Sequence, residues 1–301
     1  MATSDPEVWQ AAVPVRLELA PNEVTTPEAP PPVYVMAPRM SYLPIIAQQL
    51  LSSFEHVLPP GENTPWFEYR RLPLKWQLPI GVLYDLLANE DEQPWQLTIH
   101  YRHYPSENLL PWSSPAALSN HFFSSLKEAG YICRWSNTNA VMTMTNTARD
   151  DLWQSIQAHD HKQYASILES LSLTPQARDA QAPQIPIRLL IRAGKSGYLS
   201  GYDCISLTSQ PAAALEESSE EPLLLESTLE ALLASSLEQD AFNKLQSDLQ
   251  SGQQHVVVNG IQPPLKTPVA WLHTNLHYPD HFLYVVIRTF SNGQTSGPSS
   301  S

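Results

Sequence analysis

Residues 13–19 read Val-Pro-Val-Arg-Leu-Glu-Leu, and residues 185–191 read Ile-Pro-Ile-Arg-Leu-Leu-Ile. Pro-Leu-Lys at 73–75 recurs at 264–266, and an apolar strand that ends in arginine follows in each half. Three anchors in the same order indicate an internal repeat. The sequence of 301 residues is long enough for two such copies and a further unit.

Each copy reads strand, strand, helix, strand, short helix, strand from its apolar periodicity. Strands are expected near 13–19, 33–38, 66–69 and 95–102 in the first copy, and near 185–192, 203–208, 255–258 and 282–288 in the second. This order is that of a ubiquitin-like roll, or β-grasp, in which a mixed sheet wraps one helix. The expected fold class is therefore α+β, with two ubiquitin-like folds flanking a helix-rich middle domain.

Boundaries follow from the repeat and from shifts in composition. The expected units are an N-terminal helical segment (1–12), a first ubiquitin-like domain (13–104), a helix-rich domain (105–172), a linker (173–184), a second ubiquitin-like domain (185–290) and a disordered tail (291–301). The offset between the copies grows from 172 to 191 residues. We expect the polar, acidic stretch near 209–222 to be a solvated loop that accounts for this growth.

Capping signals place two helices. Ser41 is expected to cap the long helix of the first copy, and Ser114-Pro115 to start the first central helix. The apolar stripe of that central helix should stop at Gly130. Its members share one helical face: Leu118, Phe122, Leu126 and Ala129.

Charge and cysteine content exclude several classes of protein. The formal net charge is −13, which opposes general binding to nucleic acid or to anionic membranes. The first twenty residues have no apolar run, so no signal peptide is expected, and no later stretch approaches a membrane-spanning length. With only two cysteines, the sequence predicts a reduced, cytoplasmic protein.

Few residues suggest catalysis, and no cofactor or metal is expected. His273 and His277 are spaced like two metal ligands, but no third ligand is evident in sequence, so both are interpreted as surface or rim histidines. The pairs His100 and His103, and His159 and His161, are interpreted in the same way.

The two cysteines carry the other catalytic hypothesis. Cys133 or Cys204 could carry a thioester in a transfer enzyme, yet neither has an evident histidine or helix start that would lower its pKa. Both are therefore interpreted as packing or inert cysteines.

Lys127 follows Leu126 of the central stripe and should project beside it, toward solvent. A lysine amine has an ordinary pKa of about 10.4 and is almost wholly protonated at pH 7. It would act as a nucleophile only if another enzyme supplied an activated acyl group and a proton acceptor.

The chain resembles the autophagy protein 5 family over nearly all of residues 6–288. Seven blocks carry the resemblance: Ala37–Pro44 (Ala-Pro-Arg-Met-Ser-Tyr-Leu-Pro), Trp66–Tyr69, Pro73–Trp76 with Pro79–Gly81, His121-Phe122 with Leu126–Ala129, Asp160–Gln163, Ile185–Arg188, and Asn259–Pro263 through Trp271-Leu272 to Tyr278–Asp280.

The resemblance implies a non-catalytic conjugation acceptor. Lys127 would receive the C-terminal glycine of the ubiquitin-like autophagy protein 12 through an isopeptide bond, and a groove between domains would bind an N-terminal helix of autophagy protein 16. The assembly would act, E3-like and with the lipidation conjugating enzyme, to promote transfer of autophagy protein 8 to phosphatidylethanolamine. Peripheral membrane association, at the preautophagosomal structure, would come through partners.

Two other hypotheses stay open. A cysteine-dependent transfer enzyme would lose activity on thiol labelling, whereas a scaffold would not. An unconjugated adaptor would use its ubiquitin-like folds only for docking, and substitution of Lys127 by arginine would then change nothing in cells.

Overall fold

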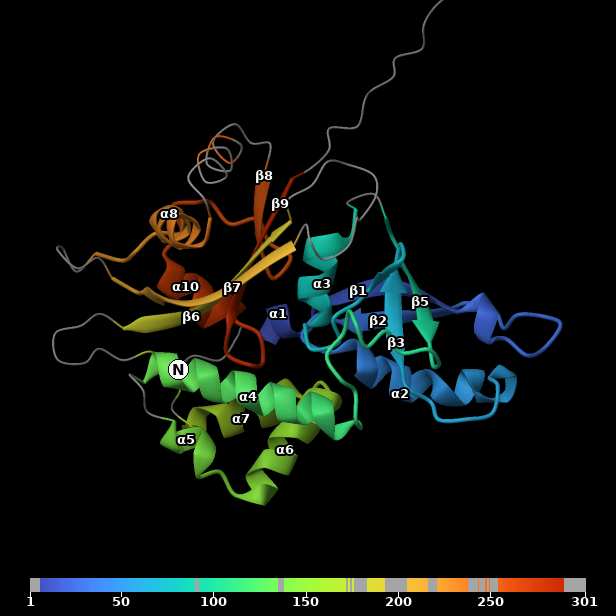
Figure 1. The fold of residues 1–301 in the computed structure, drawn as a ribbon. Helices are drawn as coiled ribbons and strands as arrows, with labels where there is room; N and C mark the ends of the chain where they lie inside the picture. Colours follow the sequence, from blue (N-terminus) through green and yellow to red (C-terminus); the bar gives the residue numbers. More distant parts are fainter. Residues whose placement is uncertain are drawn as a thin grey trace, which may run out of the picture.

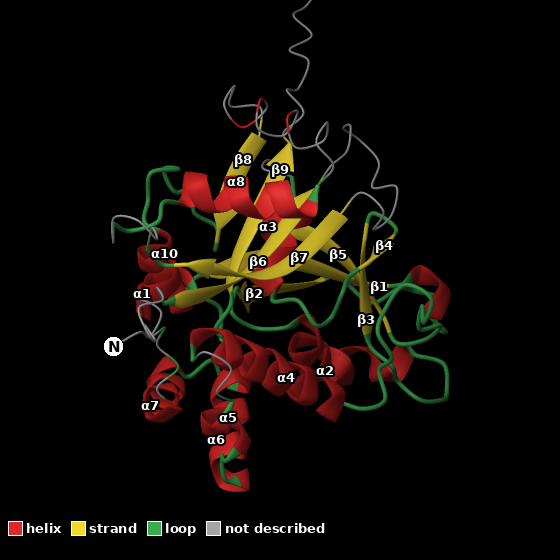
Figure 2. Cartoon of the chain, turned by 60° about the vertical axis from the view of Figure 1, so that its left-hand side comes forward, coloured by secondary structure: helices red, strands yellow, loops and turns green. Residues whose placement is uncertain are grey.

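The computed structural model describes residues 6–89, 92–134, 138–171, 173, 175, 183–192, 205–215, 221–237, 243, 247, 249 and 254–289. Two ubiquitin-like folds flank a helix-rich domain, as the repeat predicted (Figure 1). In both views the sheets lie on one side of the molecule and the helices α4 to α7 lie on the other (Figure 2). Among the described residues, no helix has the length and apolar character needed to cross a bilayer.

The first ubiquitin-like fold has a five-stranded sheet in the order β2-β1-β5-β3-β4, in which β1 and β5 run parallel. Its strands are β1 (Ala12–Leu19), β2 (Val33–Pro38), β3 (Trp66–Tyr69), β4 (Leu72–Pro73) and β5 (Trp95–His100). Its helices are α2 (Leu43–Phe54), α3 (Ile80–Leu87) and the short turns η1 (Pro21–Glu23) and η2 (Glu55–Val57). A four-residue helix, α1 (Pro6–Trp9), precedes the sheet.

The helix-rich domain follows the first sheet. It consists of α4 (Ala116–Cys133), α5 (Asn139–Met142), α6 (Asn146–Gln157) and α7 (His161–Leu171). The buried side chains of α4 fall on one face and include the four that the sequence stripe named. That face joins the same apolar core as α2 and the first sheet.

The second ubiquitin-like fold has a four-stranded sheet in the order β7-β6-β9-β8. Its elements are β6 (Gln184–Arg192), β7 (Ile205–Ala213), α8 (Leu225–Ser236), β8 (Gln254–Val258), α10 (Val269–Leu276) and β9 (Leu283–Thr289). One face packs on α8 and α10, whereas the other joins the core of the remaining domains through α3 and α4. A continuous core therefore ties the three parts together.

Several local predictions were wrong. Strand β7 extends to Ala213, so residues 209–213 of the expected acidic loop belong to the sheet, while 216–220 lie outside the described residues. Tyr42, not Ser41, occupies the cap position of α2, and Ser41 is buried. The helix α4 begins at Ala116 without a side-chain cap and runs three residues beyond Gly130, because Gly130 sits in its buried face.

Candidate functional site

The exposed face of α4 carries Lys127. Asn120, Ser124, Lys127 and Tyr131 are all exposed and recur at spacings of three or four residues, which places them on one stripe of the helix. Among the described residues, no hydrogen bond or ion pair engages the Lys127 amine. The structure therefore places Lys127 where the sequence predicted, on a helix whose opposite face is fully packed.

The neighbour of Lys127 anchors α4 to the second sheet. The Glu128 carboxylate accepts from Arg188 of β6 at 2.9 Å and from the Ser209 hydroxyl of β7 at 2.9 Å. Figure 1 shows α4 running along that sheet. The helix that carries Lys127 is thus held at a fixed position relative to the second ubiquitin-like fold.

Arg188 is the centre of a buried polar network. Its guanidinium donates to the Asp280 carboxylate at 3.1 Å, to the Tyr284 hydroxyl at 2.7 Å and to the Ser125 hydroxyl at 3.2 Å. It also stacks 3.8 Å above the ring centroid of Phe282. Burial by itself would lower the pKa of the Arg188 guanidinium. The interactions with Tyr284 and Asp280 favour its charged form more strongly, so the pKa is raised above its ordinary value. The network keeps a permanent positive charge between α4 and the second sheet.

A second buried network joins the two ubiquitin-like folds. Arg39 lies 2.5 Å from Asp85, whose carboxylate also accepts from the Gly260 backbone at 2.8 Å, and Arg39 donates to the Asn259 side chain at 3.3 Å. The left-handed Gly260 (φ 79°) allows this approach, since a Cβ there would lie 2.9 Å from Arg39. Residues from four of the blocks that carried the family resemblance therefore lie in these two buried networks. The blocks themselves are far apart in sequence.

An apolar groove opens between the first ubiquitin-like fold and the helix-rich domain. It has a volume of about 420 Å³ and is bounded by α2, the start of α4 and the side of α6. Its apolar lining includes Ile45, Leu51, Trp112, Leu118 and Trp153. A second, shallower hollow continues it along α2 and the end of α6. Such a surface suits the apolar face of an amphipathic helix.

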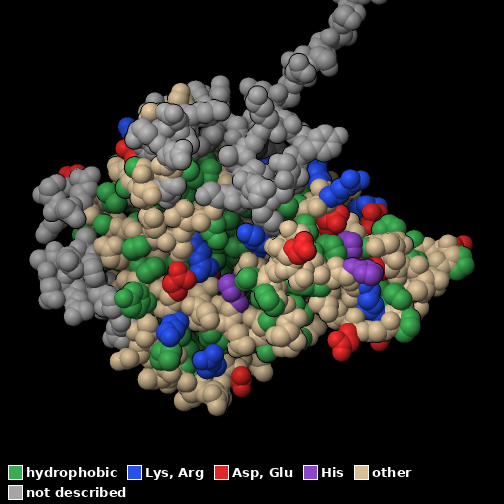
Figure 3. All heavy atoms as spheres, in the orientation of Figure 1, with side chains coloured by type: hydrophobic (Ala, Val, Ile, Leu, Met, Phe, Trp, Pro, Cys, Tyr) green, Lys and Arg blue, Asp and Glu red, His purple; other side chains and the backbone are tan. Residues whose placement is uncertain are grey.

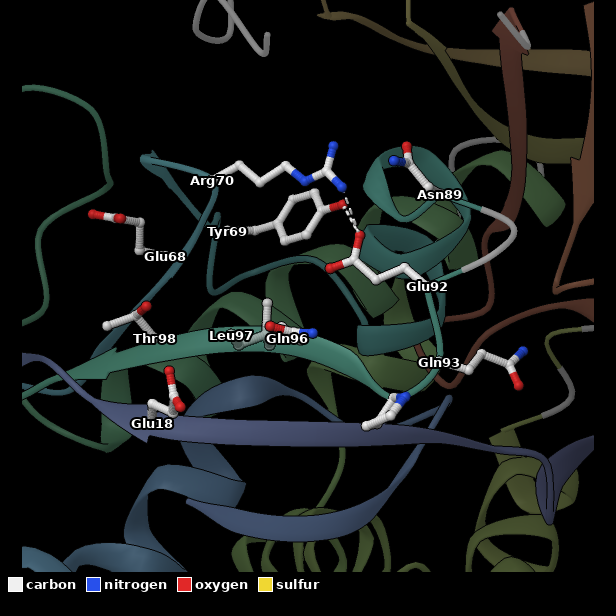
Figure 4. A pocket seen from close by; sticks show the side chains of 11 residues that line it. Glu18, Glu68, Tyr69, Arg70, Asn89, Glu92, Gln93, Gln96, Leu97 and Thr98 are labelled. Atoms are coloured by element: carbon white, nitrogen blue, oxygen red, sulfur yellow. Dashed lines mark hydrogen bonds and ion pairs between the residues drawn. The ribbon is translucent and has the colours of Figure 1, made fainter. Parts of the chain in front are cut away.

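A polar hollow of about 600 Å³ lies on the first sheet (Figure 4). Its acidic side chains are Glu18, Glu68 and Glu92, and Glu92 is engaged by the Tyr69 hydroxyl at 2.6 Å and by Arg70 at 3.0 Å. The Glu92 carboxylate is therefore bonded to groups of the same fold.

The cysteine hypothesis gains no support from burial. Cys133 is fully buried, and burial raises the pKa of its thiol to about 12, so it is not a poised nucleophile. Cys204 lies outside the described residues.

The histidine interpretation was wrong for His100, His273 and His277, which are all buried. His273 lies next to Cys133 and His281, which sequence spacing could not reveal, since Cys133 comes from another domain.

On the face drawn in Figure 3, charged side chains of both signs are interspersed with apolar and uncharged surface. The structure therefore defines the class by its fold: a protein with two ubiquitin-like folds around a helical domain that carries an exposed lysine.

Comparison with known proteins narrows this class. Models of three domains of autophagy protein ATG5 match in order: the UblA domain at residues 8–101, the alpha-helical bundle region at 115–174 and the UblB domain at 184–287. The chain is 31% identical to Autophagy protein 5 of Arabidopsis thaliana, covering 93% of this chain and 96% of that protein. It is 30% identical to Autophagy protein 5 of Oryza sativa subsp. indica, covering 93% and 92%.

The structure also resembles the crystal structure of Kluyveromyces marxianus Atg5, with a TM-score of 0.70 and 16% identity over 94% of this chain and 98% of that one. The chain belongs to the autophagy protein 5 family, and this supports a role in autophagy.

Proposed function

We propose that this chain is the acceptor of the ubiquitin-like autophagy protein 12, joined by an isopeptide bond to Lys127. The observation that carries the proposal is the exposed, unengaged amine of Lys127 within Leu126-Lys127-Glu128, on a helix fixed from its opposite face. In this proposal an activating and a conjugating enzyme supply the acyl group as a thioester.

The proposed reaction at Lys127 needs no cofactor. The neutral amine attacks the thioester carbonyl of the C-terminal glycine, the C–N bond forms, the C–S bond breaks, and the thiol of the conjugating enzyme leaves. The amine releases its proton to a base of that enzyme. Fixing α4 through Glu128 and Arg188 limits the conformations that the enzyme must select.

The conjugate, together with autophagy protein 16, would act as an E3-like assembly for the lipidation of autophagy protein 8 with phosphatidylethanolamine. We propose the apolar groove between α2, α4 and α6 as the binding site of the autophagy protein 16 helix, because it is apolar and lies between domains. Location in the cytoplasm and, peripherally, at the preautophagosomal membrane would follow from these partners.

A denaturing immunoblot of cells that express wild-type chain or Lys127→Arg tests the acceptor. We expect a large covalent mass shift in wild type, its loss in Lys127→Arg, and loss of autophagy protein 8 lipidation with it. Lys162→Arg, at an exposed lysine of α7, is the matched control and should keep the shift. A shift that survives Lys127→Arg would place the acceptor on another lysine, and no shift in wild type would favour an unconjugated adaptor.

The groove has its own test. Ala116, exposed at the start of α4, lines it, so Ala116→Trp should fill it and weaken co-purification of autophagy protein 16 without loss of thermal stability. Undiminished co-purification would contradict the assignment.

A further inference from the structure

Three buried side chains outside the acceptor site converge where the helix-rich domain meets the second ubiquitin-like fold. Cys133 ends α4, His273 lies on α10, and His281 lies in the loop before β9. Each offers one ligand atom, and these atoms all lie within 4.8 Å of one another. None of the three residues is more than 1% exposed. We call these residues the Cys–His cluster.

The two imidazoles of the Cys–His cluster are oriented by backbone carbonyls. His281 Nε2 donates to the carbonyl oxygen of Leu173 at 3.1 Å, and His273 Nε2 donates to the carbonyl oxygen of His281 at 3.1 Å. In a neutral ring, this leaves the lone pair on Nδ1 of each histidine. Imidazoles that bind metal ions are commonly oriented in this way, with the second nitrogen bonded to a carbonyl.

His281 Nδ1 has no hydrogen-bond partner among the described residues, although it is buried. A buried polar atom without a partner is uncommon in folded proteins, because its desolvation is uncompensated. A coordinated cation would supply the missing interaction.

The backbone holds His281 in an unusual conformation. Its φ is 67°, in the left-handed region that non-glycine residues rarely adopt, and a tight turn fixes it: His281 N–H donates to the Tyr278 carbonyl at 2.8 Å and Tyr278 N–H donates to the Phe282 carbonyl at 3.0 Å. Such conformations are retained where the surrounding structure or a function requires them. Here the turn directs the ring toward Cys133.

The protonation states fit coordination. Each ring donates its Nε2–H to a backbone carbonyl, and a ring that keeps this one proton is neutral, the form that binds metal. On binding, the thiol of Cys133 would lose its proton to solvent and the sulfur would bond the ion.

We propose that Cys133, His273 and His281 bind a structural zinc ion. Nitrogen and thiolate ligands in a closed, buried setting favour Zn²⁺ over Ca²⁺ or Mg²⁺. Adjacent ligands of tetrahedral zinc are about 3.3–3.8 Å apart for bonds of about 2.0–2.3 Å. The ligand atoms here lie within 4.8 Å of one another, so they would have to approach by up to about 1.0–1.5 Å on binding. The nearby His277, whose ring centroid lies 4.7 Å from that of His281, would have to move toward the ion to supply a fourth ligand.

A zinc ion here would join two domains. It would fasten the end of α4, and through His281 the carbonyl of Leu173 after α7, to α10 of the second ubiquitin-like fold. Lys127 lies on the same helix, six residues before Cys133, about 9 Å along its axis. The metal would therefore strengthen the junction that positions the acceptor helix, but its binding can be measured on the bare, unconjugated chain.

The direct test uses the full wild-type chain. The protein is unfolded with denaturant and chelator, refolded with or without Zn²⁺ or Co²⁺, and freed of loose metal by gel filtration. We expect about one equivalent of metal per chain, a higher melting temperature with Zn²⁺, and, with Co²⁺, a thiolate-to-metal charge-transfer band together with the visible bands of tetrahedral cobalt. Refolded wild type without stoichiometric metal, or without a thiolate band, would overturn the proposal.

Variants identify the ligands. Cys133→Ser should remove the thiolate band and His281→Gln should weaken metal binding at least tenfold, whereas Cys204→Ser and His56→Gln should leave both unchanged. His56 is an exposed histidine and Cys204 is the second cysteine of the sequence. A band that persists in Cys133→Ser and disappears in Cys204→Ser would assign the metal elsewhere. The wild-type measurement decides the proposal even if a cluster variant fails to fold.

Discussion

The Glu128 carboxylate lies 2.9 Å from the guanidinium of Arg188, and the pair joins the helix that carries Lys127 to the first strand of the second ubiquitin-like fold. Glu128 is half exposed, whereas Arg188 is almost completely buried. We therefore expect replacement of Glu128 to cost little stability. Replacement of Arg188 should cost more, because Arg188 also forms an ion pair with the buried Asp280 carboxylate at 3.1 Å.

Arg188→Met should destabilise the protein by about 3–5 kcal/mol, because it leaves the Asp280 carboxylate buried without its counter-charge. Chemical denaturation, followed by circular dichroism, measures the loss. Arg16→Met is the matched control: Arg16 pairs with Glu18 on an exposed strand surface, so its loss should leave the midpoint unchanged. Equal losses in the two variants would show that the Arg188 network contributes nothing beyond a surface pair.

Gly81→Ala should loosen the contact between the ubiquitin-like folds. A Cβ at this position would lie 2.4 Å from the Tyr278 hydroxyl and 3.0 Å from Arg39 Cβ, and overpacking of this kind costs about 1–3 kcal/mol. Removing the hydroxyl with Tyr278→Phe should recover part of the loss. A double-mutant cycle on the free energy of unfolding measures this coupling; strictly additive effects of the two substitutions would contradict the close approach.

The repeat in the sequence predicted both ubiquitin-like folds, but not how the second differs from the first. β1 alternates buried and exposed or half-buried residues, whereas every interior residue of β6 is buried. Where β1 has Glu18, β6 has Leu190, which packs in the core shared with the other domains. The continuous apolar run is typical of a strand covered on both faces, yet the second cover comes from α3 and α4, whose approach no local pattern specifies.

Whether each site could be predicted from the sequence also depends on whether it lies within one element or between domains. Lys127 could be placed because exposure on one helix depends only on helical periodicity. The Cys–His cluster could not, because 140 residues separate Cys133 from His273 and the contact depends on domain packing. The pairing of Arg39 with Asp85, 46 residues apart, was hidden for the same reason.

His159 should make the stability depend on pH. Burial, and then the charge of His161, lower its pKa below the ordinary 6.5, so below that value the unfolded chain binds more protons than the folded one. Its contribution is complete above about pH 6.5 and is lost as the pH falls toward the folded pKa. His159→Asn keeps a residue that tolerates the local φ of 56° and should flatten this part of the profile. Parallel pH profiles for wild type and variant would contradict the assignment.

Trp9 connects the N-terminal helix to the helix-rich domain, so the short segment before β1 should matter for stability. Its indole N–H donates to the His159 carbonyl at 3.2 Å, and its ring lies 4.6 Å from that of Tyr164, centroid to centroid. Trp9→Ala would open a cavity at a fully buried position and should cost about 3–5 kcal/mol. Glu7→Ala, in the same helix but exposed, should cost far less. Thermal unfolding of both variants provides the comparison, and a Trp9→Ala protein as stable as wild type would mean that α1 does not hold the bundle to the first sheet.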